Sequence, residues 1–418
     1  MEELPLKQES AEAGREKSLF KNRSFLFLWI AGLFSGLSIS IIMFAQAWYV
    51  VQILNMEASL GLVYIAMAIA RLIFMAVGGV LADRMSRSLI MFLSDFSRAL
   101  LLIGLVAVLL TGQVSLWPFI SFAFIFGVLD AFFWPSGNSL IPSIVSESQL
   151  TRANSIIQMT YQLTTIVGPL IAGFVIAWWD FSFVFGMTAG LLFTGGILIY
   201  FVKAKPVNSE HSDLDKGMFE SIKEGFDYVS QSSVLLAFIL KTLFLNLFFT
   251  GPFIVGVPIF VKNILKGDTL DYSYLEGSLA IGMVSGSFLI AMMNLRVKRG
   301  PVSLASQGLM ALCLLCLSQT IFLWQSLISG FLLGIFMMIS NISAVSAIQN
   351  VAQKDKIGRV MSLQTMASIG LTPISYGITS LALSFGLSID WIMLTGAICL
   401  IACTALLYWR VPAIRKID

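Results

Sequence analysis

Long runs of apolar residues, separated by short polar segments, dominate this 418-residue chain. Each run reaches the roughly 20 residues that a helix needs to cross the hydrocarbon core of a bilayer. Because the runs are continuous rather than alternating, they exclude an outer-membrane β-barrel. The pattern predicts an all-α membrane protein with twelve transmembrane helices, expected at about residues 24–54, 58–81, 89–111, 115–135, 153–178, 182–202, 234–261, 275–295, 302–322, 325–347, 361–384 and 388–409.

The basic residues indicate how these helices are oriented. With the loop from Asp83 to Arg87 placed inside, nearly all lysines and arginines outside the helices fall on the inner side, and only Lys262 and Lys266 fall on the outer side. Positive charge is retained on the cytoplasmic side of membrane proteins. The sequence therefore predicts that both termini are cytoplasmic.

A polar segment divides the helices into two groups of six. We expect a cytoplasmic tail at 1–23, a six-helix bundle at 24–203, a cytoplasmic linker at 204–233, a second bundle at 234–409 and a tail at 410–418. In the linker, Phe219, Ile222, Phe226 and Val229 recur at helical spacing, which is typical of an amphipathic helix on the membrane surface. A plain flexible linker is the alternative.

The two halves also look related at an offset of about 207 residues, and parallel repeats of six helices are typical of transporters with a central substrate site. The aligned pairs are Trp117 and Trp324, Gly127 and Gly334, Arg152 and Arg359, and Ser155 and Ser362.

Composition supports a membrane protein and argues against other classes. The chain is 57% hydrophobic and 12% charged, and soluble domains carry roughly twice that charged fraction. Its net charge of +3 is spread over many loops, which does not indicate nucleic-acid binding. A single histidine, four cysteines inside apolar runs and no glycine-rich nucleotide loop leave no candidate for a metal site, a nucleophilic triad or an ATPase. We expect no enzyme activity and no cofactor.

The loop between the second and third helices is the largest charge cluster at the membrane boundary. Asp95 and Arg98 lie one helical turn apart, so they can form an ion pair. We interpret the cluster as a cytoplasmic latch that holds one conformation, with a static salt-bridge network as the alternative. The latch residues are Gly79, Asp83, Arg84, Arg87, Asp95 and Arg98.

Charged groups inside the membrane are costly, so each is a candidate for function. Asp130 lies in the fourth helix among aromatic residues, where it could exchange a proton or anchor a cationic substrate. The alternatives are a structural partner of Arg71 or Arg152, or a carboxylate close enough to the cytoplasmic end of the helix to be hydrated. Arg71 lies well inside the second helix and needs a counter-charge, and we therefore take Asp130 and Arg71 as proton-coupling candidates. Lys241 is expected to extend its ammonium to the cytoplasmic interface, with lining of a cavity as the alternative.

Uncharged polar and aromatic residues in the helices predict a central cavity for an amphipathic or apolar organic molecule. Packing is the usual role of such aromatic residues. A glycine–proline pair in the fifth helix predicts a hinge, because proline removes a backbone donor and kinks a helix. The hinge residues are Gly168, Pro169 and Gly173, and the cavity candidates are Gln46, Trp48, Gln158, Tyr161, Gln162, Asn246, Phe249, Asn341 and Gln364.

Several of these segments resemble a known family. The run Gly79-Val-Leu-Ala-Asp83-Arg84-Met-Ser-Arg87 is similar to the loop signature between helices 2 and 3 of the major facilitator superfamily. The segment from Asp130 to Ser155 resembles its bacterial branch of macrolide-efflux and enterobactin-exporter-type proteins, and Gly168-Pro169 is similar to the helix 5 motif of its exporters.

The chain also departs from these motifs. Thr164 and Ala172 occupy glycine positions of the helix 5 motif, and the second-half loop at 294–300 lacks the acidic residue. The fourth helix has no embedded arginine of the kind seen in many drug–proton antiporters. Proton antiport is therefore implied by the resemblance and not by these residues.

Together, the pattern and the resemblance predict a secondary transporter of the bacterial cytoplasmic membrane, with two pseudo-symmetric bundles around a central cavity. The expected activity is proton-coupled efflux of a drug, macrolide or siderophore by a monomer, with protons, the small molecule and the lipid bilayer as its partners. The alternatives are a proton-coupled importer, a lipid translocator, or a receptor or scaffold that does not transport.

Overall fold

The protein is helical throughout the part of the chain that is described. The structure, a computed structural model, describes residues 19–112, 115–203, 218–293, 298–353 and 356–416, and within them it leaves the side chains of residues 76, 79, 80, 82–84, 218–223, 293 and 416 undescribed. In these segments every regular element is a helix, and twelve spans are long and apolar enough to cross a bilayer. The predicted all-α architecture of twelve membrane helices is confirmed.

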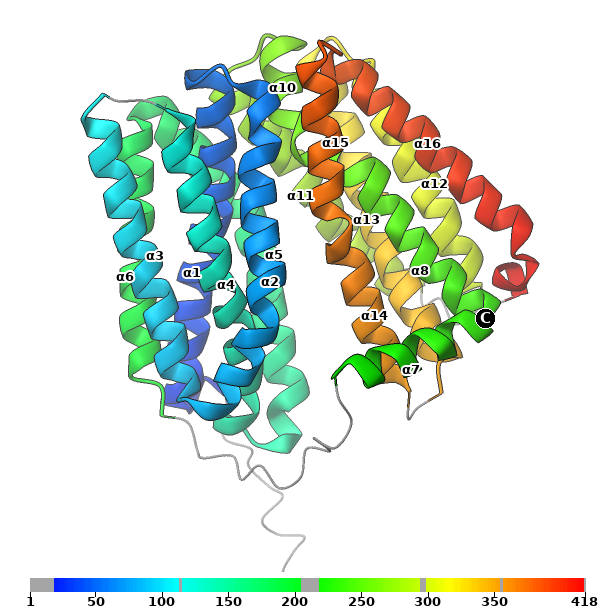
Figure 1. The fold of residues 1–418 in the computed structure, drawn as a ribbon, viewed down its shortest axis with the longest axis horizontal. Coiled ribbons are helices and arrows are strands. Elements are labelled where there is room, and N and C mark those ends of the chain that lie inside the picture. Colours follow the sequence, from blue (N-terminus) through cyan, green and yellow to red (C-terminus); the bar gives the residue numbers. More distant parts are fainter. Residues whose placement is uncertain (1–18, 113–114, 204–217, 294–297, 354–355, 417–418) are drawn as a thin grey trace, which may run out of the picture.

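The first six spans form one bundle (Figure 1). They are α1 (Arg23–Trp48, continued by the π-helical η2, Tyr49–Ile53), α2 (Leu60–Arg84, preceded by η3, Glu57–Ser59), α3 (Arg87–Leu110), α4 (Leu116–Ile144), α5 (Glu147–Trp178) and α6 (Phe181–Tyr200).

The last six spans form the second bundle, which follows a surface helix, α7 (Met218–Gln231). They are α8 with η4, α9 and α10 (Ser233–Leu245, Asn246–Thr250, Gly251–Ile254 and Gly256–Asn263), α11 (Thr269–Met293), α12 (Arg299–Ser318), α13 (Leu323–Val351), α14 with α15 (Ile357–Gly370 and Thr372–Ser384) and α16 (Ile389–Arg410). Short helices η1 (Leu19–Lys21) and η5 (Pro412–Lys416) flank the two bundles.

The fourth helix is longer than predicted. It continues through Pro135 and Pro142 to Ile144 instead of ending near residue 135. Serine hydroxyls in this segment donate to its carbonyl groups, from Ser139 to the carbonyl of Pro135 at 2.8 Å and from Ser143 to that of Leu140 at 2.6 Å. A membrane helix can continue through proline even though proline removes one backbone donor.

Glycines allow close helix crossings at equivalent places in the two halves. A Cβ atom on Gly127 of α4 would collide with the carbonyl oxygen of Met67 on α2. Likewise, a Cβ atom on Gly334 of α13 would collide with the carbonyl oxygen of Leu279 on α11. Small residues let membrane helices approach in this way. Gly127 and Gly334, which the sequence repeat aligns, thus lie at equivalent helix crossings in the two bundles.

The two bundles meet at one end of the molecule and diverge toward the other, where α7 lies (Figure 1). At the closed end, the ammonium of Lys262 on α10 lies 3.1 Å from the carboxylate of Glu57, and it donates to the carbonyl of Val51 and the side chain of Asn55, both at 2.6 Å. The predicted topology makes this end the extracellular one. In that orientation the molecule is open toward the cytoplasm.

A cleft of about 620 Å³ separates α2 from α14 on the open side. Leu72 and Met75 form its α2 wall, and residues from Gly358 to Ile369 form the opposite wall. The cleft therefore runs between the two bundles rather than within one of them.

The amphipathic segment of the linker does form a helix, α7, which packs against α14. Glu224 of α7 forms an ion pair with Arg359, and the ammonium of Lys356 lies 4.6 Å from the ring centre of Tyr228. Phe226 is 60% exposed on the other side of the helix. This arrangement excludes a flexible linker for residues 218–231.

Candidate functional site

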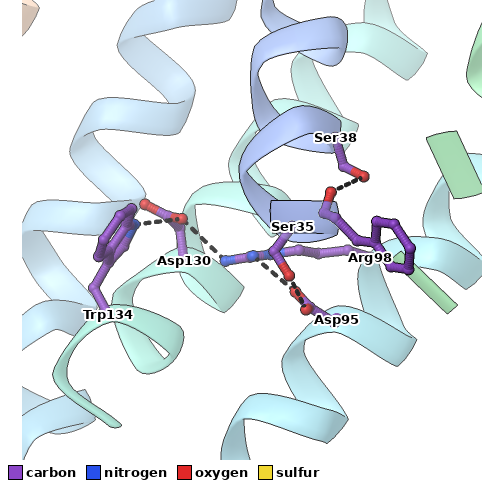
Figure 2. A network of polar contacts seen from close by, with 7 residues as sticks. Ser35, Ser38, Asp95, Arg98, Asp130 and Trp134 are labelled. Atoms are coloured by element: carbon purple, nitrogen blue, oxygen red, sulfur yellow. Dashed lines mark hydrogen bonds and ion pairs between the residues drawn. The ribbon is translucent and has the colours of Figure 1, made fainter. Parts of the chain in front are cut away.

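A buried ion network joins α1, α3 and α4 (Figure 2). The guanidinium of Arg98 lies 3.2 Å from the carboxylate of Asp95 and 3.0 Å from that of Asp130, and none of these three residues is more than 2% exposed. The second oxygen of Asp95 accepts a hydrogen bond from Ser35 on α1 at 2.5 Å. The pairing of Asp95 with Arg98, predicted from their spacing, is confirmed.

Asp130 is held by three donors. Arg71 of α2 lies 3.2 Å from one of its oxygens, and the other accepts from Arg98 at 3.0 Å and from the indole of Trp134 at 3.1 Å. The predicted alternative, a structural pairing with Arg71, is therefore present. Two arginines balance two aspartates, so the network has no net charge. The side chain of Arg71 is 34% exposed, which makes Arg71 the member of the network in contact with the surroundings.

The latch residues do not all lie in one cluster. Asp95 and Arg98 point into the bundle, where α1 and α4 supply their partners, and not toward the loop after α2. Arg87 instead donates to the carbonyl of Ser139 at 2.9 Å. Thus the single cluster expected from the sequence is wrong for Asp95 and Arg98, because the face of α3 that carries them is covered by other helices. Side chains of Gly79, Asp83 and Arg84 lie outside the described residues, and their latch role stays a prediction.

The cavity candidates of the first half lie in different environments. Gln46 is buried and its amide points at the carbonyl of Phe119 on α4 at 3.5 Å, so it packs within the bundle. Trp48 donates to Thr269 at 2.7 Å and belongs to the closed end. Tyr161 contacts Trp134 beside a small internal cavity of about 30 Å³. Gln158 is exposed and Gln162 is half-buried on the same helix, α5.

The structure brings together two cavity candidates of the second half. The amide of Gln364 on α14 donates to Thr242 on α8 at 2.6 Å, and Asn246 donates to the carbonyl of Thr242 at 2.9 Å. Phe249 is buried and stacks on Phe253, so its ring serves packing. Asn341 on α13 is exposed. Sequence reasoning missed Thr242, because a threonine in a membrane helix is too common to stand out.

Lys241 does not extend its ammonium to the membrane interface. The residue is 3% exposed, and its ammonium donates to the hydroxyl of Ser340 on α13 at 2.9 Å. Ser340 also donates to the carbonyl of Ser303 on α12 at 3.1 Å. The expectation of an interfacial lysine was wrong because α8 turns this residue toward α12 and α13. Like Ser35 of α1 in the first half, Lys241 lies on the first span of its bundle and bonds to a neighbouring helix.

Glu276 is a membrane-embedded carboxylate that sequence reasoning did not single out. It lies well inside α11, which begins at Thr269, whereas the hydropathy pattern placed the start of this helix at about residue 275. A carboxylate one residue into a predicted span reads as an interfacial group. In the structure it lies seven residues after the start of α11 and is half-buried.

Two of the three predicted hinge residues, Pro169 and Gly173, lie where the two bundles touch. Pro169 lies inside the continuous helix α5, and its carbonyl accepts from Ser273 of α11 at 3.0 Å. Gly168 packs against Ser40 of α1, and Gly173 packs against Ser273. Hinge motion itself stays a prediction.

Over the described part of the chain, the structure contains no group of three or more histidine, cysteine, aspartate or glutamate residues that could hold a metal ion.

The fold and sequence match known transporters. The sequence profile of the Major Facilitator Superfamily matches residues 28–368. Macrolide efflux protein A of Streptococcus pyogenes is 25% identical over 406 residues, covering 94% of this chain and 97% of that protein. Multidrug resistance protein MdtG of Serratia proteamaculans is 24% identical over 265 residues, covering 62% of this chain and 61% of that protein.

Solved structures show the same fold. A bacterial homologue of the human lysosomal transporter Spinster, in an inward-facing conformation, superposes with a TM-score of 0.73 at 14% identity, covering 96% of this chain and 98% of that one. The nucleoside transporter NupG superposes with a TM-score of 0.75 at 14% identity, covering 94% of this chain and 100% of that one. With its twelve membrane-length helices and bacterial relatives, this multi-pass protein of the bacterial cytoplasmic membrane belongs to the Major Facilitator Superfamily of transporters.

Proposed function

We propose that the protein exports a hydrophobic or amphipathic small molecule by alternating access, in exchange for protons. The observation that carries the proposal is the arrangement of the two bundles. They are held together at one end through Lys262 and Glu57, and they are separated by a cleft of about 620 Å³ at the other. A transporter that alternates between two openings needs such a pathway, closed on one side only.

The lining of the cleft supports an apolar or amphipathic substrate such as a drug, a macrolide or a siderophore. Its walls are mostly aliphatic and thioether side chains, joined by one arginine and two hydroxyl groups. Flexible methionine side chains adapt to ligands of different shape. The lining residues are Leu72, Met75, Gly358, Arg359, Met361, Ser362, Leu363, Thr365, Met366 and Ile369. Relatives named for macrolide efflux and multidrug resistance support the same class and the outward direction.

Proton coupling is proposed for the pair of Asp130 and Arg71. Arg71 is part-exposed while Asp130 is buried, and their charged groups lie 3.2 Å apart. Protonation of Asp130 would remove its attraction for Arg71 and leave that guanidinium free to move. The transmembrane proton gradient would then supply the energy, with no further cofactor, in a monomer.

Flux measurements in proteoliposomes test the proposal. The purified protein is reconstituted, a pH gradient is imposed, and uptake or release of a panel of dyes, macrolides and siderophores is followed. We expect flux that depends on the gradient and that Asp130→Asn abolishes. Asp180→Asn is the matched control, because Asp180 is exposed at the start of α6 and asparagine retains a side-chain oxygen for its hydrogen bond to the amide of Phe183.

Three results would contradict the proposal in whole or in part. Absence of gradient-dependent flux for every compound would favour the receptor or scaffold alternative. Full gradient-driven flux in Asp130→Asn would remove the coupling role from Asp130 while leaving transport intact. Flux only in the inward direction would identify an importer.

A further inference from the structure

One face of α11 turns a carboxylate toward the opposite bundle. Tyr272 stacks on Phe44 of α1 with ring centres 4.2 Å apart, and Ser273 donates to the carbonyl of Pro169 on α5 at 3.0 Å. Glu276 lies one helical turn after these two residues, at spacings of four and three. Residues at these spacings share a helix face. Glu276 therefore faces the first bundle, on the inner side of the contacts that close the molecule.

Glu276 differs from the other embedded acids because it has no counter-charge. In the described part of the chain it makes no hydrogen bond and no ion pair, whereas Asp95 and Asp130 share two arginines. The phenol groups of Tyr64 and Tyr272 lie within electrostatic range of it. Glu276 is half-buried, and a carboxylate that is partly removed from water without a counter-charge is unfavourable. The site is thus suited to a cation.

Tyrosine side chains from three helices take part in the contacts between the two bundles. Tyr64 of α2 and Tyr376 of α15 have ring centres 5.3 Å apart across the two bundles, and Tyr272 lies on α11 itself. All three tyrosines are less than 9% exposed, and their hydroxyls make no hydrogen bond to any described residue. Aromatic faces attract cations, most strongly where water is excluded. A carboxylate with aromatic neighbours favours an organic ammonium or phosphonium ion over a small hydrated one.

The cleft between the bundles leads toward this place. Leu72, on its α2 wall, lies eight residues after Tyr64, which corresponds to about 12 Å along a helix. Ile369, on the opposite wall, lies seven residues before Tyr376, or about 10 Å. Both tyrosines thus lie beyond the cleft on the same membrane spans that form its walls. A ligand entering the cleft would reach the tyrosines before it reached the closed end.

We infer that Glu276 binds the cationic head of an amphipathic organic cation, with Tyr64, Tyr272 and Tyr376 around the head and the apolar body extending into the cleft. This inference rests on the proposed transport function and specifies its substrate class. A neutral or anionic ligand would leave the carboxylate uncompensated. The sequence suggested Asp130 as a cation anchor. In this inference Glu276, which forms no ion pair with a described residue, takes that role instead.

Binding of radiolabelled tetraphenylphosphonium to the full-length protein in lipid nanodiscs tests the inference. This probe is permanently charged and carries a large apolar surface. We expect wild type and the Asp180→Asn control to bind it. Glu276→Gln should bind it with an affinity that is lower by roughly tenfold or by a larger factor. Glu276→Asp retains the charge and should recover part of the affinity. Size-exclusion profiles check that each variant is folded. If Glu276→Gln does not fold, the affinity of Glu276→Asp can still be compared with that of wild type.

The possible outcomes separate the inference from the function on which it rests. Equal affinity of wild type and Glu276→Gln, or no binding by wild type, would overturn the cation site. If neutral compounds were still pumped in the flux assay, the proposed transport function would stand without the cation site. Saturable binding that depends on Glu276, together with no flux of any compound, would support the site and contradict transport.

Discussion

The ion network around Arg98 predicts that charge balance, more than any single contact, stabilises the first bundle. Arg98 is fully buried between Asp95 and Asp130, and its guanidinium lies 4.8 Å from the ring centre of Phe126 and 4.9 Å from that of Phe133. Arg98→Met leaves the network with one uncompensated negative charge. Asp95→Asn leaves it with one uncompensated positive charge. The double variant restores neutrality.

The expected magnitudes follow from the burial of the network. Removing one partner of a buried ion pair costs about 3–5 kcal/mol, because the remaining charge stays in a medium of low dielectric constant. Arg98→Met also loses its cation–π contacts, which are worth about 0.5–2 kcal/mol each. In Arg98→Met/Asp95→Asn both charges disappear together. We therefore expect the double variant to lose less free energy of unfolding than the sum of the single losses, by about 2–3 kcal/mol.

Unfolding by sodium dodecyl sulfate from mixed micelles, followed by circular dichroism, measures these free energies for the wild type, both single variants and the double variant. The control is Asp180→Asn, which removes an exposed carboxylate and should change the free energy by less than about 0.5 kcal/mol. The reasoning would be refuted if the free energy of unfolding lost in the double variant equalled the sum of the two single losses to within about 0.5 kcal/mol. They would mean that each side chain contributes only through its own packing.

Three further predictions concern other parts of the molecule. Gly127→Leu should sharply reduce the folded yield on gel filtration because α4 touches α2 there, whereas Gly104→Leu, with open space around it, should not; equal yields would contradict the close crossing. Lys262→Met should favour opening of the closed end by roughly 1.4- to fivefold, because its pair is part-exposed and worth about 0.2–1 kcal/mol. Double electron–electron resonance between spin labels on the two bundles measures this shift, and an unchanged distance distribution would argue against a role in closure. Lys241→Met should leave the free energy of unfolding unchanged or raise it by about 1–2 kcal/mol, since it removes a buried ammonium held only by Ser340 among the described residues. A loss of similar size in the same unfolding assay would show that the ammonium is stabilising.

Hydropathy alone was sufficient to predict the twelve membrane helices. A bilayer core of known thickness requires an apolar run of set length, so each span can be read without its neighbours. Helix ends were less predictable. Pro135 suggested an end for α4, but the helix continues to Ile144, and the early start of α11 places Glu276 about two turns into the helix.

Local spacing predicted one part of the ion network. Asp95 and Arg98 are three residues apart on one helix, and that relation holds in any fold that contains the helix. The sequence also suggested Arg71 as one possible partner of Asp130. It did not indicate that Arg98 would bind Asp130 as well, or that Ser35 would bind Asp95.

What the sequence by itself determined is therefore the membrane class, the number of helices, the family resemblance and the pairs formed within one helix. These depend on composition and on short spacings along the chain. Tertiary structure decided which charges are compensated: it surrounded Asp130 with two arginines, buried Lys241 against Ser340, and left Glu276 without an ion-pair partner among the described residues. The physical reason is that the electrostatic environment of a buried group is set by helices far away in the sequence, and only their packing brings those charges into contact.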